Sequence, residues 1–490
     1  MSTLLISFII LLFFALLMGI SYFSSKDATN ETFFTGNRRS PWYLVAFGMI
    51  GSTISGVTFI SVPGEVGNTA WTYFQFLLGN FFGYWIIALV LIPLYYRLNL
   101  VSIYTYLDQR FGVRSYKTGA FFFLLSQTIG ASFRLYLAAG VLQLAFFNAL
   151  GIPFWVTVLL TLLMIWIYTH RAGIKTVVWT DSLQTLFILG AVGITIWTVS
   201  KQLDMGFGEM ISTIDHHPYS KIFDWDWQSK TNFFKQFAAG LGIVITINGL
   251  DQNMMQKNLT CKTRKDAQKN IFWFSFAFII ANLLFLCLGV MLYFYAQQKG
   301  VELPTRSDDL YPILAMQHFG TLAGALFLLG ILAAAYSSAD SALTALTTSF
   351  CIDFLNLNTG SPKSKTTRFK VHIGFSILMF LVIIGFRIIN NDSVVSAVFR
   401  VAGYTYGPLL GLFAFGILTK RQVKDRYVPV IGLLSPILSY LININSEVLF
   451  GGYKFGFELL LLNGLITFIG LLLVTKKNTH ENDNTTLSRS

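Results

Sequence analysis

Residues 42–64 read WYLVAFGMIGSTISGVTFISVPG, an apolar stretch long enough to cross a bilayer but polar near its middle. Glycine weakens a helix interior and hydroxyl side chains compete for backbone hydrogen bonds, so a helix breaks easily here. An unwound turn exposes carbonyl oxygens that can coordinate Na⁺, whereas the alternative is that these small residues serve close helix packing. The residues concerned are Gly51, Ser52, Thr53, Ser55, Gly56 and Thr58.

A second apolar stretch with a polar centre, residues 328–350, reads LLGILAAAYSSADSALTALTTSF. Its polar centre holds Ser337, Ser338, Asp340 and Ser341. A carboxylate at the centre of a membrane helix costs about 2.5–3.5 kcal/mol, which indicates a functional role. Hydroxyl and carboxylate oxygens on adjacent turns suit a hard cation. The alternative is that Asp340 lies near the cytoplasmic helix end, where a water-filled vestibule hydrates it.

Two more charged residues lie within apolar stretches. Asp181, in AGIKTVVWTDSLQTLF, either pairs with Lys175 or completes a cation site with the serines of 328–350. We favour the cation site, because Lys175 can reach solvent unaided. Arg134 is surrounded by apolar sequence, and its planar guanidinium matches a carboxylate. That carboxylate belongs either to a solute or to the protein itself, in Asp251 or an acidic residue of another span.

Composition places the whole chain in a membrane. Of 490 residues, 54% are hydrophobic and 12% charged, whereas globular chains carry roughly 25% charged residues. The net charge of +12 therefore does not indicate nucleic-acid binding, because the location of the charges matters more than their sum. The three cysteines and six histidines show no metal-ligand spacing, and no nucleophile or phosphate-loop motif appears. We expect no enzyme chemistry.

Hydropathy predicts an all-α membrane protein with about thirteen transmembrane helices. The first apolar run has no preceding basic residue and no clear cleavage pattern, so it is predicted to be a retained helix rather than a signal peptide. The predicted spans are 3–23, 41–62, 73–96, 118–148, 153–169, 176–199, 234–256, 270–297, 318–350, 371–388, 395–418, 428–444 and 457–475.

Basic residues predict the orientation of these spans. Most of the 35 Lys and Arg residues, Lys257 among them, fall in loops after odd-numbered spans or in the C-terminal tail. Short basic loops stay in the cytoplasm, so the N-terminus is predicted outside and the C-terminus inside, in a plasma membrane of the bacterial inner-membrane type. The polar tail, residues 476–490, is predicted to be disordered.

Four segments in the same order carry a resemblance to the sodium:solute symporter family over nearly all of the chain. They are RAGIKTVVWTDSLQ (171–184), GLDQNMMQKNLTCKTRKDAQK (249–269), AAAYSSADSALTALTT (333–348) and GPLLGLFAFGILTKR (407–421). The resemblance implies two leucine-transporter-like inverted five-helix repeats. It divides the chain into an extra helix and loop (1–40), a first repeat (41–199), an extracellular loop (200–233), a second repeat (234–419), two extra helices (420–475) and the tail (476–490).

The same resemblance implies the site residues. A first sodium site maps onto the carbonyls of Gly51, Ile54 and Ala334 with the hydroxyls of Ser337 and Ser338. A second maps onto Asp181, Ser338, Asp340 and Ser341. Within the family, TISGVTFISVPG (53–64) and Arg134 look most like the bacterial sialic acid symporters. That likeness implies a solute pocket of Thr53, Ser55, Thr58, Gln75, Arg134 and Asp251.

We therefore expect a sodium-coupled symporter that imports a small polar organic solute by alternating access, with Na⁺ as coupling ion. The first candidate for the transported solute is sialic acid or another carboxylated solute. The alternative solutes are a sugar, proline, a monocarboxylate or an inorganic anion. Alternatives of another class are a proton-coupled carrier using Asp181 and Asp340, and a membrane sensor that does not transport. The expected partners are the lipid bilayer and the small-molecule solute, with neither nucleic acid nor an obligatory protein partner.

Overall fold

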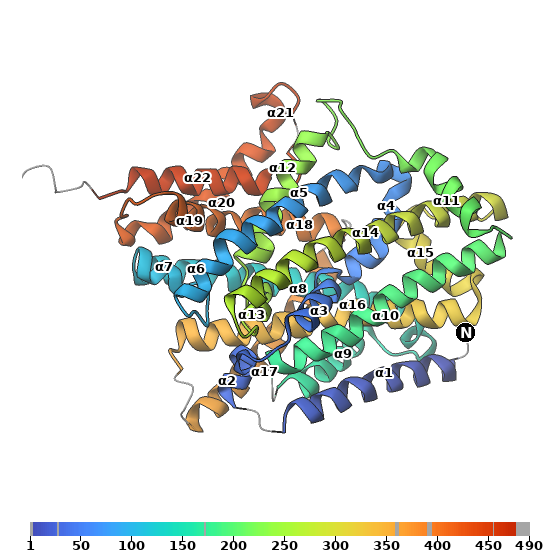
Figure 1. Ribbon diagram of the computed structural model, residues 1–490, viewed down its shortest axis with the longest axis horizontal. Helices are drawn as coiled ribbons and strands as arrows, with labels where there is room; N and C mark the ends of the chain where they lie inside the picture. The colour runs from blue at the N-terminus through green and yellow to red at the C-terminus, as the bar shows by residue number, and fades with distance from the viewer. Residues whose placement is uncertain are drawn as a thin grey trace, which may run out of the picture.

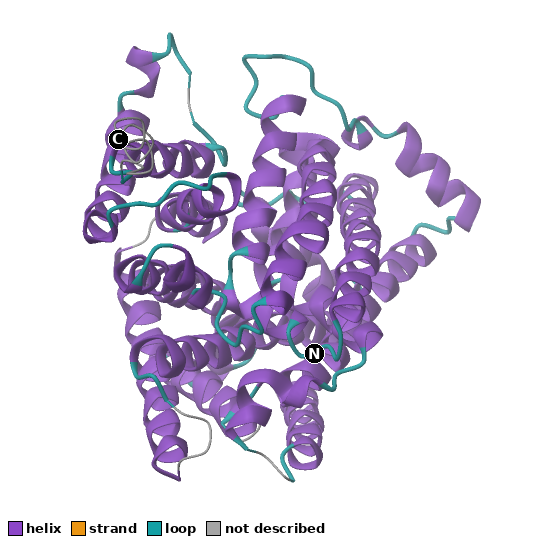
Figure 2. Cartoon of the chain, turned by 60° about the vertical axis from the view of Figure 1, so that its left-hand side comes forward, coloured by secondary structure: helices purple, strands orange, loops and turns teal. Residues whose placement is uncertain are grey.

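The computed structural model of the chain describes residues 3–26, 29–170, 173–357, 362–389, 394–453 and 455–476. Within these ranges the chain is helical, and pairing between extended segments is limited to two isolated bridges (Figure 2). This confirms the all-α class. The predicted disorder of the tail concerns residues that, beyond Lys476, lie outside the described ranges.

Twenty-two α-helices are described (Figure 1). Their bounds are α1 Thr3–Ser24, α2 Asn30–Thr35, α3 Trp42–Thr53, α4 Gly56–Thr69, α5 Tyr73–Ile86, α6 Ile92–Arg97, α7 Thr105–Arg110, α8 Val113–Ala145, α9 Phe154–Thr169, α10 Ile174–Gln202, α11 Phe207–His216, α12 Phe233–Val244, α13 Gln252–Asn258, α14 Arg264–Lys299, α15 Leu310–Ile313, α16 Gly320–Ser349, α17 Pro362–Ile389, α18 Val394–Thr405, α19 Gly407–Leu418, α20 Val428–Ile444, α21 Ser446–Leu449 and α22 Leu459–Leu473.

Each of the thirteen predicted spans coincides with one helix or with consecutive helices. By length and composition, eight described helical segments can cross a membrane, or nine if the bent pair α12–α13 forms one span. Other predicted spans correspond to shorter apolar helices, namely α3, α9, α19 and α22. The chain is therefore a multi-pass membrane protein, and the number thirteen stays a prediction.

The predicted break in residues 42–64 is confirmed between α3 and α4. The Ser55 N–H, which a continuous helix would direct to the Gly51 carbonyl, instead donates to the Thr53 carbonyl at 3.0 Å. The Ser55 hydroxyl accepts from the Thr58 N–H at 3.5 Å and so caps α4. The Gly51 carbonyl consequently loses its usual helical partner at the break.

A second break, which the sequence analysis did not predict, separates α12 and its π-helical end (Ile245–Gly249) from α13. The two parts are bent by 68°. Asp251 caps α13, because its Oδ1 accepts from the N–H groups of Asn253 at 2.7 Å and Met254 at 3.4 Å. Asp251 lies in an otherwise apolar stretch, and its capping role depends on hydrogen bonds that hydropathy does not record. The apolar pattern therefore did not reveal the bend.

Helix α16 forms the core of the molecule and packs against α3, α4, α8 and α10 (Figure 1). It is buried without interruption from Gly330 to Ser349. Glycines allow the closest approaches: a Cβ on Gly51 would lie 2.4 Å from Thr185 Oγ1 of α10, and one on Gly330 would lie 2.6 Å from the ring of Phe59. These contacts bring the polar centres of α3, α10 and α16 together in the interior.

Candidate cation and solute sites

An ion pair lies at the centre of the polar cluster. The Lys257 Nζ of α13 is 2.6 Å from Asp181 Oδ2 of α10, and each side chain is only 1% exposed. On the other carboxylate oxygen, Asp181 accepts from the Ser337 hydroxyl of α16 at 2.5 Å. Residues far apart in the sequence therefore converge on Asp181, as the cation-site hypothesis required.

Lys257 corrects the sequence analysis in two respects. It was assigned to a cytoplasmic loop, yet it is buried in α13 because Asp181 supplies the counterion that a buried ammonium needs. Lys175, the less favoured alternative partner of Asp181, forms no salt bridge with it among the described residues; Asp181 pairs with the Lys257 ammonium instead. Lys257 lies in α13, whose residues are all buried. The sequence feature that could have indicated its burial is the pair of apolar residues just before it, Met254 and Met255.

Asp340 is the second carboxylate of the cluster and is 0% exposed. Its Oδ2 accepts from the Tyr168 hydroxyl of α9 at 2.8 Å, and its Oδ1 accepts from Ser341 at 3.2 Å. The alternative of a water-filled vestibule around Asp340 is therefore wrong. Asp340 also interacts electrostatically with Asp181 and Lys257. Two carboxylates and one ammonium leave a net charge of −1 when all are ionised, which a Na⁺ at the adjacent first predicted site or a proton would balance.

The first predicted sodium site lies where α16 passes the break in the early helix. Ile54, Ala334, Ser337 and Ser338 are all buried. A Cβ on Gly56 would lie 3.4 Å from Ile331, one turn before Ala334 on α16. The Ser338 Oγ is buried and has no hydrogen-bond partner among the described residues. Carbonyl and hydroxyl oxygens with unused lone pairs fit a hard monovalent cation.

Arg134 has no direct acidic partner in the part of the chain that the structure describes. Its side chain in α8 is half-buried, the guanidinium folds back over Gly130, and Nε is buried without a hydrogen-bond partner. No described carboxylate lies within the 4.0 Å of a salt bridge, and Asp251 acts on it only at longer range. Asp251 Oδ2 instead accepts from the Tyr406 hydroxyl at 2.6 Å. The predicted direct pair between Arg134 and Asp251 is therefore wrong.

The remaining predicted solute residues differ in availability. Thr53 and Thr58 are half-buried, and the Thr53 hydroxyl has no described partner. Gln75 is 0% exposed, and its amide is occupied by the loop before α12. Its Nε2 donates to the Thr231 carbonyl at 2.8 Å and its Oε1 accepts from the Asp224 N–H at 3.1 Å. Gln75 anchors that loop, so it is not open to a solute.

Comparison with known proteins places this architecture among sodium-coupled transporters. Residues 33–425 match the model of the sodium:solute symporter family. The chain belongs to that family.

Its relatives include the sodium/sialic acid symporter SiaT of Proteus mirabilis, 28% identical over 87% of this chain and 86% of that protein. They also include the sodium/sialic acid symporter NanT of Aliivibrio fischeri, 26% identical over 85% and 83%. The human sodium/iodide cotransporter is 26% identical over 79% of this chain and 61% of its own length.

Solved structures define the fold. A substrate-bound, outward-open Na⁺-coupled sialic acid symporter superimposes with a TM-score of 0.81, covering 96% of this chain and 99% of that one at 23% identity. A nucleobase-cation-symport-1 family transporter in a closed conformation gives 0.53 at 12% identity. The leucine-transporter-like class is confirmed. The protein is a multi-pass sodium-coupled symporter rather than an enzyme, and Na⁺ is its coupling ion.

Proposed function

We propose that this symporter imports sialic acid, or a sugar acid of similar chemistry, across a bacterial inner membrane with its N-terminus outside and its C-terminus inside. The observation that carries the proposal is Arg134, an arginine inside a membrane helix with no described acidic partner. A solute carboxylate supplies the missing charge in a geometry that the guanidinium fork fits. Two of the relatives are bacterial sodium/sialic acid symporters, which supports this solute class.

Sodium binds, in this proposal, to the carbonyls of Gly51, Ile54 and Ala334 and the hydroxyls of Ser337 and Ser338. An ion bound by both α3 and α16 holds the broken end of α3 against the buried helix α16, with which α3 is in contact. The nearby polar turn carries Thr53, Ser55 and Thr58, so ion binding organises the solute pocket. Linkage makes the effect reciprocal, and bound solute strengthens sodium binding by the same factor.

We further propose that one Na⁺ accompanies each solute. The second predicted ion site needs Asp181, and the carboxylate of Asp181 is already neutralised by Lys257 at 2.6 Å. The ammonium thus takes the place of an ion that would otherwise complete the group of Asp181, Ser338, Asp340 and Ser341. One Na⁺ with a monoanionic solute carries no net charge across the membrane.

A pair of ligands tests the role of Arg134: N-acetylneuraminic acid and its uncharged methyl ester. Calorimetric titration in saturating Na⁺ should show the Arg134→Gln variant binding the acid about a hundredfold more weakly than the parent protein, because two charge-assisted hydrogen bonds are lost. The ester should bind both proteins equally weakly. The control is Arg387→Gln on α17, an exposed arginine. An unchanged affinity of Arg134→Gln for the acid would contradict the assignment.

A further inference from the structure

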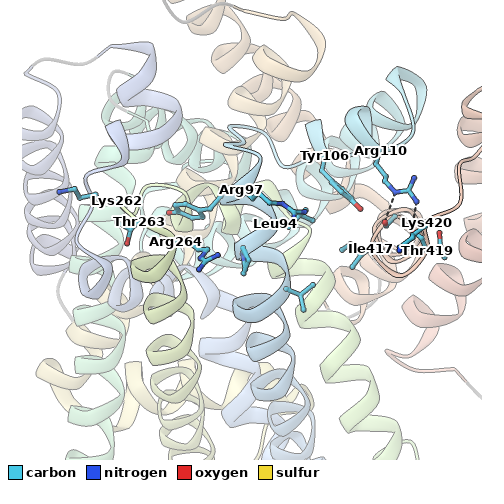
Figure 3. A pocket seen from close by; sticks show the side chains of 14 residues that line it. Leu94, Arg97, Tyr106, Arg110, Lys262, Thr263, Arg264, Ile417, Thr419 and Lys420 are labelled. Atoms are coloured by element: carbon cyan, nitrogen blue, oxygen red, sulfur yellow. Dashed lines mark hydrogen bonds between the residues drawn. The ribbon is translucent and has the colours of Figure 1, made fainter.

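A pocket of about 1040 Å³ opens between α6 with the π-helical turn before it (Ile87–Leu91), α7, the start of α14 and the end of α19 (Figure 3). Basic side chains dominate its polar lining, and its fourteen lining residues include no acidic one. The five basic residues are Arg97, Arg110, Lys262, Arg264 and Lys420. They come from three separate parts of the sequence, each of which is predicted to reach the cytoplasmic face.

Most of these charges are available to a ligand. Arg97, Lys262, Arg264 and Lys420 are exposed, and none forms a salt bridge with a described carboxylate. Arg110 has a structural role, since its guanidinium donates to the carbonyls of Gly416 at 3.2 Å and Thr419 at 2.7 Å. It thereby holds the end of α19 against the pocket. Four exposed cations therefore line one pocket, and none of them forms a salt bridge with a described carboxylate.

The apolar wall of the pocket points toward the bilayer. Val90, Pro93, Leu94 and Ile417 line the cavity beside the basic residues. Val90 is 41% exposed, and the neighbouring Leu89 and Leu418 are 69% and 76% exposed. Exposed apolar side chains on membrane helices face lipid tails rather than water. A ligand in this pocket therefore meets positive charge at one end and hydrocarbon at the other.

We propose that this pocket binds the phosphate headgroup of an anionic phospholipid of the phosphatidylglycerol type, from the cytoplasmic leaflet. Basic pockets between membrane helices on the cytoplasmic side recognise such headgroups. The acyl chain lies along Val90 and Ile417, which a soluble phosphate cannot exploit. The leaflet assignment rests on the proposed orientation. Because the lipid contacts α6, α14 and α19 at once, it stabilises the packing of segments that are distant in the sequence.

The test measures lipid binding to the delipidated, full-length protein by native mass spectrometry and by thermal unfolding. Phosphatidylglycerol, phosphatidylcholine and inorganic phosphate are titrated separately. Only phosphatidylglycerol should raise the unfolding temperature at low concentration. The variant R97Q/R264Q/K420Q should need about a hundredfold more of this lipid, since each charge near an anionic surface contributes about fivefold. The single variants should each need about fivefold more, which keeps the test valid if the triple variant folds poorly.

The control K365Q/K370Q removes two exposed lysines of α17 that do not line the pocket. It should retain the affinity of the parent protein. Equal loss in this control, or unchanged affinity in the triple variant, would overturn the proposal in favour of general surface charge. Inorganic phosphate that stabilises the protein as well as the lipid does would overturn the lipid assignment in favour of a soluble anion.

Discussion

At the residue scale, the ion pair of Lys257 and Asp181 determines how charge is balanced inside the protein. Both side chains are 1% exposed, so neither charge is hydrated, and Ser337 satisfies the second oxygen of the carboxylate. Removing one partner of such a pair leaves the other charge buried and uncompensated. The pair therefore contributes to the folded state and, in our proposal, to the sodium stoichiometry.

Lys257→Gln is expected to destabilise the protein by about 3–5 kcal/mol, because Asp181 is left without its counterion. High Na⁺ should recover part of this loss, since the vacated space can then accept an ion. Thermal unfolding in Na⁺ and in choline measures both effects. The double variant Lys257→Gln with Asp181→Asn should recover most of the lost stability, because no charge is then left unpaired. If the double variant is no more stable than Lys257→Gln alone, the two residues do not stabilise the protein as an ion pair.

Ser338→Ala tests the first sodium site. The Ser338 hydroxyl is buried with no described partner, so its loss removes an ion ligand while leaving no protein group unpaired. We expect the Na⁺ concentration for half-maximal uptake to rise about tenfold or more. Ser341→Ala serves as the comparison, because that hydroxyl donates to Asp340 and lies outside the proposed first site. Unaltered sodium dependence in Ser338→Ala would remove Ser338 from the site.

Candidate site residues could be predicted from the sequence where burying the side chain costs much free energy. Asp181 and Asp340 stood out because a carboxylate in an apolar stretch needs a partner. Their partners could not be predicted: Lys257 and Tyr168 come from α13 and α9, whose rotation relative to α10 and α16 no local pattern encodes. Gln75 was implied only by the family resemblance, and in the fold its amide is occupied by the loop before α12.

At the element scale, two interrupted helices meet the buried helix α16. The break between α3 and α4 was predictable, because Gly51, Ser52, Thr53, Ser55 and Gly56 concentrate weak helix formers in one turn. The bend before α13 was missed, because an N-capping aspartate in an apolar stretch resembles any other membrane carboxylate. Gly249 ends the turn before this bend, but one glycine is a weaker break signal than the cluster of small and hydroxyl residues at 51–56.

Close contact between α3 and α10 gives the prediction at this scale. A Cβ on Gly51 would lie 2.4 Å from Thr185 Oγ1, whose hydroxyl accepts the Gly51 N–H at 2.9 Å. Gly51→Ala must push the broken helix away from α10, so we expect sodium-dependent uptake to fall at least tenfold. Gly190→Ala on α10 meets nothing within 4 Å and should leave uptake unchanged. Full activity in Gly51→Ala would show that this contact does not position the site.

At the scale of the whole molecule, the helices form a bundle (Figures 1 and 2). The polar cluster is buried within it, whereas many large apolar side chains are exposed on its outside. Hydropathy located the long apolar helical stretches but not the short helices between them, such as α7 and α11, since the bilayer imposes its length and composition only on the spans. It did not determine how many stretches cross fully, because α9, α19 and α22 are short. The basic residues still predict one orientation, although Lys257 must be removed from that count.

Cysteine labelling tests the orientation. The native cysteines are buried or half-buried, so an introduced surface thiol dominates the reaction. In intact cells, a membrane-impermeant maleimide should label Lys201→Cys, which is exposed at the end of α10, and should not label Lys365→Cys on α17. Permeabilised cells should label both. The reverse pattern in intact cells would invert the proposed topology.

Sodium-gradient uptake of N-acetylneuraminic acid into proteoliposomes at constant pH tests the central claim most directly. Uptake should require external Na⁺, with a Hill coefficient near one, and an inside-negative potassium diffusion potential should not accelerate it, because one Na⁺ and one carboxylate cancel. Uptake that continues without Na⁺ would contradict sodium coupling, and uptake that accelerates with the potential would contradict the role of Lys257 as the second cation.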